Sequence, residues 1–371
     1  MSARAASGLT RRQMITVGLG GIVGLAAAGA GALELVTHDA LPGRSYLDQL
    51  DGACSVPAPP LVFSAPGPSV SGTFYSRARR RDVGYTIAYP PGARPGNRLP
   101  LIIGLHAYGG DHGNALGSLG LTRGLDLRIG GRPLPPMAIA AADGGGGYWN
   151  PHPDDDPMGM IIDELIPLCQ RLGLGLGSRR IGTLGISMGG YGAILLAEQY
   201  PEVFRAAAAI SPAIWTSYEQ ARSVNPGAYA SASAFAAADA VTHASSLKGV
   251  AIRVATGRDD PFRSGVEALA RALPRSAVVR ISPGCHSGPF FQSQLPPSLA
   301  FLGNHLTGPH PVRATPLNPG CCYVATPWVQ RCCSACRTGD EQLGDLGRVE
   351  CSALAEVVAA DEKVKSVRVV H

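Results

Sequence analysis

Short, continuous apolar runs alternate with helix-like stretches from Asp82 onward, and this alternation constrains the fold more than any other feature. Strands that are apolar throughout are typically buried on both faces, as in a parallel sheet covered by helices. We therefore predict an α/β protein with a mostly parallel central sheet flanked by helices. The predicted strands are Val83–Tyr89, Leu99–His106, Met137–Ala142, Arg180–Ile186, Ala206–Ile210, Val250–Thr256 and Ala277–Ile281, and the predicted helices are Met160–Leu172, Gly190–Tyr200, Ser264–Leu273 and Pro297–Leu306.

The composition permits one large domain with appendages. Hydrophobic residues make up 45% of the 371 residues, enough for a sizeable core, and they exclude a disordered or collagen-like chain. The net charge of +5 comes almost entirely from arginine. Basic residues cluster densely only at Arg77–Arg81, which we interpret as a solvated strand edge. Because nucleic-acid binders concentrate basic residues on one face together with aromatics, we expect no nucleic-acid partner.

The N-terminal residues 1–32 have the pattern of a targeting segment. Thr10-Arg11-Arg12-Gln13-Met14-Ile15 leads into a Gly- and Ala-rich apolar run, and small residues follow at Ala30-Gly31-Ala32. The pattern resembles a twin-arginine export signal. We expect an extracytoplasmic protein, in the cell envelope or secreted. The alternative is a single uncleaved anchor, which would associate the protein with the membrane.

The remaining segments differ in amino-acid composition. Residues 33–70 form a Pro-rich spacer, residues 71–308 the predicted α/β domain, and residues 309–371 a tail that holds six of the nine cysteines. This tail fits a zinc site, a set of disulfides or an extension without ordered structure. Asn225–Ser246 is interpreted as an insertion beside the active-site face, with a role in a lid. A disulfide between Cys54 and Cys285 is a further hypothesis.

The strongest chemical motif is Gly185-Ile186-Ser187-Met188-Gly189. A strand-like run ends at its serine and a helix-like run begins just after it, which is the strand–turn–helix setting that a G-x-S-x-G nucleophile requires. We predict that side chains at Gly185 and Gly189 would collide with their neighbours in so tight a turn. The alternative is a glycine-rich turn around an ordinary serine.

A serine nucleophile needs a base that is held by an acid, and the expected chain order is Ser, then Asp or Glu, then His. His286 lies in the loop after a predicted strand, where ligands meet sheets of this kind. Asp259 and Asp260 both follow the strand Val250–Thr256. We prefer Asp260 as the acid, and Asp259 remains the alternative.

Further residues are candidates for the surroundings of this site. The backbone N–H groups of Met188 and Tyr108 are predicted to form an oxyanion hole, and His106 is expected to hydrogen-bond to the loop backbone. Tyr148, Trp149 and Trp215 are candidate substrate-binding residues. His152-Pro153-Asp154-Asp155-Asp156 is interpreted as an acidic surface loop, and a Ca²⁺ site with oxygen ligands is the alternative. The sequence shows no cofactor motif, so we expect no metal and no cofactor.

Taken together, these motifs resemble the esterase D group of α/β-hydrolases over roughly residues 70–306. The matching residues are Leu105-His106-x-Tyr108-Gly109-Gly110, Gly185-x-Ser187-Met188-Gly189-Gly190-Tyr191-Gly192, Gly257-x-x-Asp260-x-Phe262, Gly284-x-His286 and Asp163-Glu164-Leu165-Ile166-Pro167. The resemblance implies an α/β-hydrolase fold, with Ser187 as nucleophile, Asp260 as acid and His286 as base. Its members often carry an aromatic residue shortly after the histidine, whereas here Ser287-Gly288-Pro289 precedes Phe290 and Phe291.

These observations lead us to expect an exported serine esterase that hydrolyses carboxylic esters through an acyl-enzyme intermediate. Its substrate would be a small-molecule ester or an ester of a glycolipid or polysaccharide. One alternative is an acyltransferase that moves an acyl group onto a sugar or lipid hydroxyl of the cell envelope. The other is a non-catalytic envelope-binding protein that retains the hydrolase fold.

Overall fold

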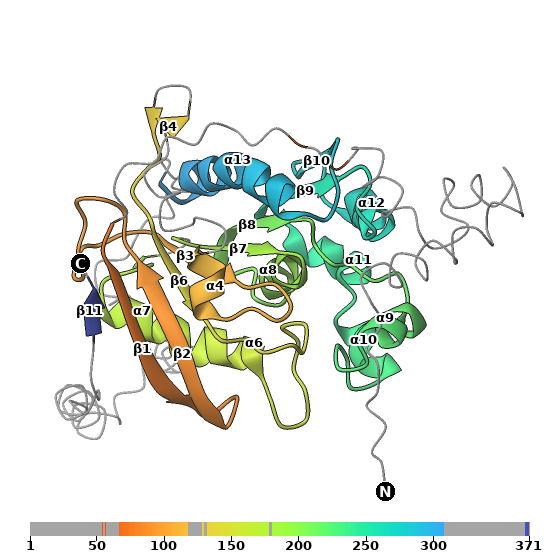
Figure 1. Ribbon diagram of the computed structural model, residues 1–371, viewed down its shortest axis with the longest axis horizontal. Coiled ribbons are helices and arrows are strands. Elements are labelled where there is room, and N and C mark those ends of the chain that lie inside the picture. The colour runs from red at the N-terminus through yellow and green to blue at the C-terminus, as the bar shows by residue number, and fades with distance from the viewer. Residues whose placement is uncertain are drawn as a thin grey trace, which may run out of the picture. The chain divides into compact units, whose positions relative to one another are not determined.

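Figure 1 shows the chain in a computed structural model. The structure describes residues 67–117, 128–129, 132–177, 180–307 and 368–370, together with Cys54 and Val56. The chain divides into two units, residues 1–307 with 370–371 and residues 308–369. The predicted export signal, the spacer apart from its described residues, and the cysteines of the tail lie outside the described residues, so their predictions remain open.

Strands β1 to β10, apart from one short hairpin, form a single sheet in the order β10-β9-β8-β7-β3-β6-β2-β1. The six strands from β10 to β6 run parallel, and β2 and β1 are antiparallel to their neighbours. The strands are β1 (Ser69–Ser76), β2 (Arg81–Ala88), β3 (Leu101–Leu105), β6 (Ala138–Ala142), β7 (Ile181–Ile186), β8 (Phe204–Ile210), β9 (Ala251–Gly257) and β10 (Val278–Ser282); β4 (Arg128–Ile129) pairs with β5 (Arg132–Pro133), and β11 is Arg368–Val370.

Helices cover both faces of this sheet. They are α4 (His112–Gly117), α6 (Pro157–Gly159), the π-helix η1 (Met160–Leu165), α7 (Ile166–Arg171), α8 (Met188–Gln199), α9 (Tyr218–Val224), α10 (Ala232–Ala237), α11 (Ala240–His243), the 3₁₀-helix η2 (Ala244–Leu247), α12 (Arg263–Ala272) and α13 (Gly288–Thr307). Alternate residues of β3 show how the core is divided. Ile102 packs with the leucines of α13, whereas Ile103 packs with α8 on the other face, and Figure 1 shows these two helices on either side of β7 and β8.

The predicted elements between Val83 and Leu273 are confirmed, with ends that differ by a few residues. The sequence prediction for the last helix is wrong at its start, because α13 begins at Gly288 and continues through Pro296 and Pro297. A proline removes one helical hydrogen bond and usually breaks a helix. Here the apolar stripe of Phe290, Leu295, Leu299, Leu302 and Leu306 is buried, and this packing outweighs the local preference.

The arginine run at Arg77–Arg81 also differs from its prediction. Arg79 is only 3% exposed, and its guanidinium holds both carboxylate oxygens of Asp155 at 2.6 and 2.7 Å. Arg80 pairs with Asp154 on the surface. The Arg79–Asp155 pair therefore links the arginine run to the acidic loop, since bidentate arginine–carboxylate pairs are strong and directional.

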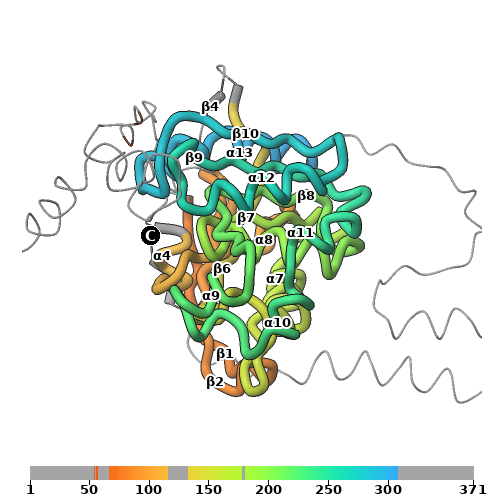
Figure 2. The backbone as a smooth tube through the Cα atoms, turned by 90° about the vertical axis from the view of Figure 1, so that its right-hand side faces the viewer, coloured from red at the N-terminus to blue at the C-terminus, as the bar shows by residue number. Residues whose placement is uncertain are grey.

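The segment Asn225–Ser246 folds into α10, α11 and part of η2, and it can be followed in green from α9 to α11 in Figure 2. It is joined to the body of the domain by buried hydrogen bonds. Asn150 Nδ2 donates to the carbonyl of Ala228 over 2.9 Å, and the Tyr191 hydroxyl donates to the carbonyl of Ala238.

Among the described helices, none combines the length and the apolar character needed to cross a membrane.

Candidate active site

Ser187 lies at the sharp turn between β7 and α8. Its backbone has φ 55° and ψ −121°, a strained conformation for a residue with a side chain. The turn leaves no room around it, because a Cβ atom at Gly185 would lie 2.0 Å from the Gly189 carbonyl oxygen, and one at Gly189 would lie 2.1 Å from that of Leu105. The predicted collisions at both glycines are thus confirmed, and the geometry is that of a nucleophile elbow.

His286 and Asp260 meet Ser187 from two other loops. His286 Nε2 lies 2.9 Å from Ser187 Oγ, and His286 Nδ1 lies 2.9 Å from Asp260 Oδ2. A carboxylate only accepts hydrogen bonds, so Nδ1 carries the proton and donates to Asp260. Nε2 is then an acceptor, and the serine hydroxyl donates to it. The structure therefore brings together the serine, the preferred aspartate and the preferred histidine.

The carboxylate of Asp260 has no exposed surface, whereas the imidazole of His286 is 22% exposed. Burial alone would raise the pKa of Asp260. Three interactions outweigh burial and hold the pKa of Asp260 below its ordinary value of 3.8. They are the hydrogen bond from His286, the attraction of that ring when it is protonated, and the Phe262 N–H, which donates to Oδ1 over 2.9 Å. Asp260 is therefore ionised at neutral pH.

His106 supports the neighbouring loop, as the sequence predicted. Its Nδ1 donates to the Ala107 carbonyl over 2.8 Å, and its Nε2 accepts from the Gly144 N–H over 2.8 Å. Burial lowers the pKa of this ring, although its backbone hydrogen bond acts in the opposite direction. A neutral imidazole is the form that can donate with one nitrogen and accept with the other.

The two predicted oxyanion donors stand at the expected ends of secondary structure. Met188 is the first residue of α8, and amides in the first turn of a helix have no acceptor within it. Tyr108 lies in the loop after β3, where the Gly110 N–H donates to the Ala107 carbonyl; among the described residues the Tyr108 N–H has no backbone acceptor. The Tyr108 side chain is 64% exposed and lies over Gly146.

All three candidate substrate-binding residues are buried, with Tyr148 at 4% and Trp215 at 7% exposure, so the prediction that they are open to a substrate does not hold in this structure. Trp149 is the most enclosed and has no exposed surface. Its indole N–H donates to the His106 carbonyl over 3.2 Å, and the ring packs against the backbone of Gly144 and Gly192. Tyr148 and Trp149 both have positive φ, near 54° and 57°. Trp149 therefore holds the glycine-rich turn in place and presents no face to a ligand in this structure.

Aromatic rings lead away from the histidine in a continuous row. Phe262 and Phe291 contact His286 at centroid distances of 5.2 and 5.0 Å, and Trp215 meets Phe262 edge to face at 4.8 Å. Tyr148 follows, 6.1 Å from Trp215. Sequence reasoning did not assign a role to Phe262 or Phe291. The matching motif included Phe262, whereas Phe291 lies five residues after the histidine, and only the first turn of α13 brings it back to the ring.

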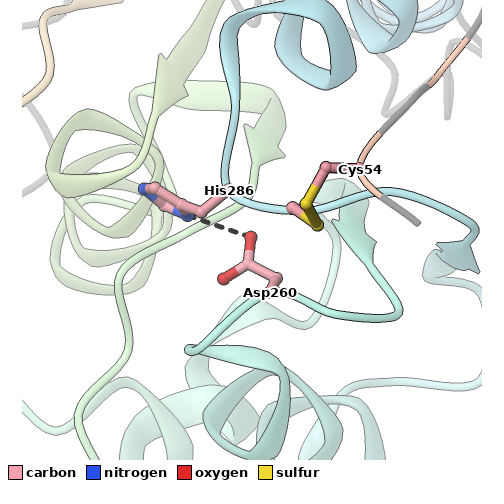
Figure 3. The surroundings of a disulfide bond; sticks show 4 residues. Cys54, Asp260 and His286 are labelled. Carbon is pink, nitrogen blue, oxygen red and sulfur yellow. Dashed lines mark hydrogen bonds and ion pairs between the residues drawn. A yellow bond between two sulfur atoms is a disulfide. The ribbon is translucent and has the colours of Figure 1, made fainter. Parts of the chain in front are cut away.

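A disulfide joins Cys54 to Cys285, the residue directly before His286, and confirms that hypothesis (Figure 3). The two cysteines are 231 positions apart in the sequence, with Cα atoms 5.0 Å apart. Cys169 in α7 is buried as a free thiol. Within the described ranges, no three side chains of the His, Cys, Asp or Glu type gather as a metal ion would require.

The doubly wound sheet, the strained serine at its centre and the serine–histidine–aspartate contacts define the class of α/β-hydrolases. Solved structures with the same fold include a ferulic acid esterase (17% identity, 65% of this chain and 100% of that one, TM-score 0.54). An S-formylglutathione hydrolase from Agrobacterium tumefaciens (17% identity, 66% and 97%, TM-score 0.53) and the fluorophosphonate-binding serine hydrolase F of Staphylococcus aureus (15% identity, 65% and 100%, TM-score 0.53) also share it.

The family is established by sequence. The model of the family described as "Putative esterase" matches residues 76–301, which is more than half of the chain. No curated protein matches the sequence. The chain belongs to this esterase family, and it is a hydrolase that acts on carboxylic ester bonds.

Proposed function

We propose that this chain is an exported serine esterase that works through an acyl-enzyme formed on Ser187. The observation that carries the proposal is the unbroken pair of 2.9 Å contacts from Ser187 through His286 to Asp260. A serine hydroxyl is a weak nucleophile until a base takes its proton. The three groups stand in the order and at the distances that such activation needs.

In the first half of the reaction, His286 Nε2 takes the proton from Ser187 Oγ as this oxygen attacks the ester carbonyl. Asp260 keeps the ring in the correct tautomer and stabilises the imidazolium that forms. The imidazolium then donates its proton to the leaving alcohol oxygen as the carbon–oxygen bond breaks. The acyl group remains on Ser187 as an ester.

In the second half, water enters and His286 Nε2 takes one of its protons. The oxygen of the water attacks the acyl carbonyl, and the same proton returns to Ser187 Oγ as the acid product departs. Both halves pass through a tetrahedral oxyanion. We assign its stabilisation to the N–H groups of Met188 and Tyr108, which would each have to lie near 3 Å from that oxygen.

The aromatic row beside His286 supports a substrate with an apolar part near the reacting carbonyl. Phe262 and Phe291 are half-buried, so each ring combines a packed side with a partly open one. Tyr108 adds an exposed ring on the loop after β3, suited to the face of an aromatic ring or a sugar. These features fit a small-molecule ester and an ester of a glycolipid or polysaccharide alike.

Export is supported by the covalent chemistry of the site. Disulfides persist in oxidising compartments and are rare where thiol reductants keep cysteines reduced. The Cys54–Cys285 bond therefore agrees with the twin-arginine pattern near the N-terminus. We propose an extracytoplasmic location on these two grounds.

The proposal is tested by labelling the full chain with a fluorophosphonate probe and locating the label by mass spectrometry. We expect the label on Ser187, no label in Ser187→Ala, and a fall in turnover of a p-nitrophenyl ester by a factor on the order of 10⁴–10⁶ in that variant. Ser298, a buried serine of α13 whose hydroxyl donates to the Gln294 carbonyl, serves as the matched control, since Ser298→Ala should keep the label on Ser187.

A folded wild-type protein that takes no label would contradict the proposal and favour a non-catalytic binding protein. Retention of most activity by Ser187→Ala would show that another group is the nucleophile. Adding an alcohol acceptor to the assay separates two fates of the acyl group. Free acid as the main product supports hydrolysis, and a new ester as the main product identifies an acyltransferase.

A further inference from the structure

The loop that carries His286 is short and reaches the surface. It connects β10, which ends at Ser282, to α13, which begins at Gly288. Two backbone hydrogen bonds join it to the loop of Asp260: the Arg258 N–H donates to the Ser282 carbonyl over 2.8 Å, and the Asp259 N–H donates to the Gly284 carbonyl over 3.0 Å. Both bonds lie on the β10 side of Cys285, and His286 follows between them and the start of α13.

The third tie is the disulfide. Cys285 is buried at 5% exposure, and its sulfur is bonded to Cys54, a residue that precedes the first strand. Figure 3 shows Cys54 beside this loop, next to the contact between His286 and Asp260. The covalent bond thus attaches to the loop one residue away from the imidazole.

The segment of Cys54 also packs against the loop. A Cβ atom at Gly284 would lie 2.9 Å from a methyl group of Val56 and 2.4 Å from the Phe290 ring, and Gly284 has φ 135°. The backbone at Gly284 is thus enclosed between Val56 and the start of α13. Opening the disulfide would release Cys54 and Val56 together and remove one wall of this enclosure.

We propose that the Cys54–Cys285 disulfide is a positioning element of the catalytic site, which holds His286 in simultaneous contact with Ser187 and Asp260. The inference rests on the proposed function. Both contacts of the ring measure 2.9 Å, so a displacement of about 1 Å breaks one of them, and misplacement on this scale costs about 100-fold in rate. Cys54 and Cys285 are positioning residues, since neither touches the reacting atoms.

A consequence is that the site is assembled only where the cysteine pair is oxidised. Reduction by a dithiol such as dithiothreitol transfers two electrons and two protons to the pair. The S–S bond breaks, two thiols form, and the reagent closes to its cyclic disulfide. The esterase would therefore have low activity in a reducing compartment and full activity after the pair is oxidised.

The test compares the oxidised full chain with Cys54→Ser, which lies far from the catalytic groups in sequence, and with Cys169→Ala as the matched control. We expect kcat for a p-nitrophenyl ester to fall 10- to 100-fold in Cys54→Ser with KM within about threefold. The rate of fluorophosphonate labelling at Ser187 should fall by a similar factor. Cys169→Ala should behave as the wild type.

Dithiothreitol provides the second measurement. It should lower the wild-type kcat to the level of Cys54→Ser, leave Cys54→Ser unchanged, and act reversibly when the reagent is removed under oxidising conditions. The unchanged response of Cys54→Ser separates this bond from the cysteines of the tail. Circular dichroism recorded in parallel reports whether the fold is retained.

The outcomes are distinct. Equal kcat in the oxidised wild type, the reduced wild type and Cys54→Ser overturns the positioning role and leaves the proposed esterase intact. Loss of the folded signal on reduction also overturns it, because the bond would then stabilise the whole domain. An oxidised wild type that neither cleaves esters nor takes the label refutes the proposed function instead.

Discussion

Two buried carboxyl groups of the same domain have opposite properties. Asp260, after β9, accepts hydrogen bonds from His286 and from the Phe262 N–H, and its pKa lies below the ordinary value. Glu198, near the end of α8, is 4% exposed, and neither of its carboxylate oxygens has a hydrogen-bond partner among the described residues. Burial and then the nearby charge of Asp239 raise the pKa of Glu198 to about 9.

The comparison shows that partners, and not burial, decide the charge of a buried acid. Both groups lose hydration, which favours the neutral form. Asp260 regains the lost stabilisation from donors aimed at its oxygens, so it is a carboxylate that can orient an imidazolium. Glu198 gains none, so it is a neutral acid at pH 7. The acid of the candidate active site is thus distinguished from another buried acid by the hydrogen-bond donors that face its oxygens.

The largest expected effect is a difference in kcat between variants of the two acids. Asp260→Asn should lower kcat by a factor on the order of 10³–10⁴, because an amide no longer fixes the tautomer of His286. Glu198→Gln should leave kcat within about twofold. Steady-state kinetics on one ester measures both.

The neighbour Asp259 supplies the matched control. Asp259→Asn should change kcat by no more than a few-fold, since the structure places Asp260, and not Asp259, against His286. A large loss in Asp259→Asn with a small loss in Asp260→Asn would reverse the assignment of the acid. Equal losses in Asp260→Asn and Glu198→Gln would remove the distinction between the two acids.

The second effect is on stability. The pKa of Glu198 rises from 4.5 to about 9 on folding, so between these values the folded state holds a proton that the unfolded state has lost. The free energy of unfolding should therefore fall as pH rises from about 5 to about 9, by at most about 1.4 kcal/mol per unit. Glu198→Gln should match the wild type near pH 5 and exceed it by about 1–3 kcal/mol near pH 9.

Urea unfolding at a series of pH values measures this difference. Glu202→Gln is the control, because Glu202 is exposed four residues further along the chain, where the substitution should change the free energy of unfolding little. Parallel pH curves for the wild type and Glu198→Gln would mean that Glu198 has an unrecognised partner in solution.

The smallest effect concerns a buried group on α8 that does have a partner. The Tyr191 hydroxyl donates to the Ala238 carbonyl, so Tyr191→Phe should lower the free energy of unfolding by about 1 kcal/mol and leave kcat within about twofold. Tyr75→Phe, at a ring that is 63% exposed, should be neutral. A tenfold loss of kcat in Tyr191→Phe would instead show that the contact of α8 with the C-terminal end of α10 positions Ser187.

Much of the fold and the centre of the site could be predicted from local patterns. The apolar runs predicted seven strands of the sheet, and the spacing of glycines around Ser187 predicted a turn that tolerates no side chains. The order Ser187, Asp260, His286 followed from each residue lying just after a strand. Such signals are local, because strand periodicity and steric exclusion act within a few residues.

The rest depended on contacts between distant segments. The start of α13 was misplaced because its prolines oppose a helix locally, while the buried leucines that stabilise it pack on another element. Trp149 lies just after a run of four glycines and Tyr148, a sequence typical of an exposed turn. In the structure it is nevertheless enclosed by Gly144, Gly192 and His106. The role of Arg79 likewise depended on Asp155, 76 positions away.

The sequence by itself determined the sheet, the strained serine turn and the residue types that meet above it, since these follow from periodicity and from the steric demands of single turns. Only the tertiary structure decided that Cys54 binds Cys285 across 231 positions, and that of two buried acids one meets donors and the other meets none. The physical reason is that hydrogen bonds and disulfides need atoms within about 2–3 Å, and only the packed chain brings distant residues that close.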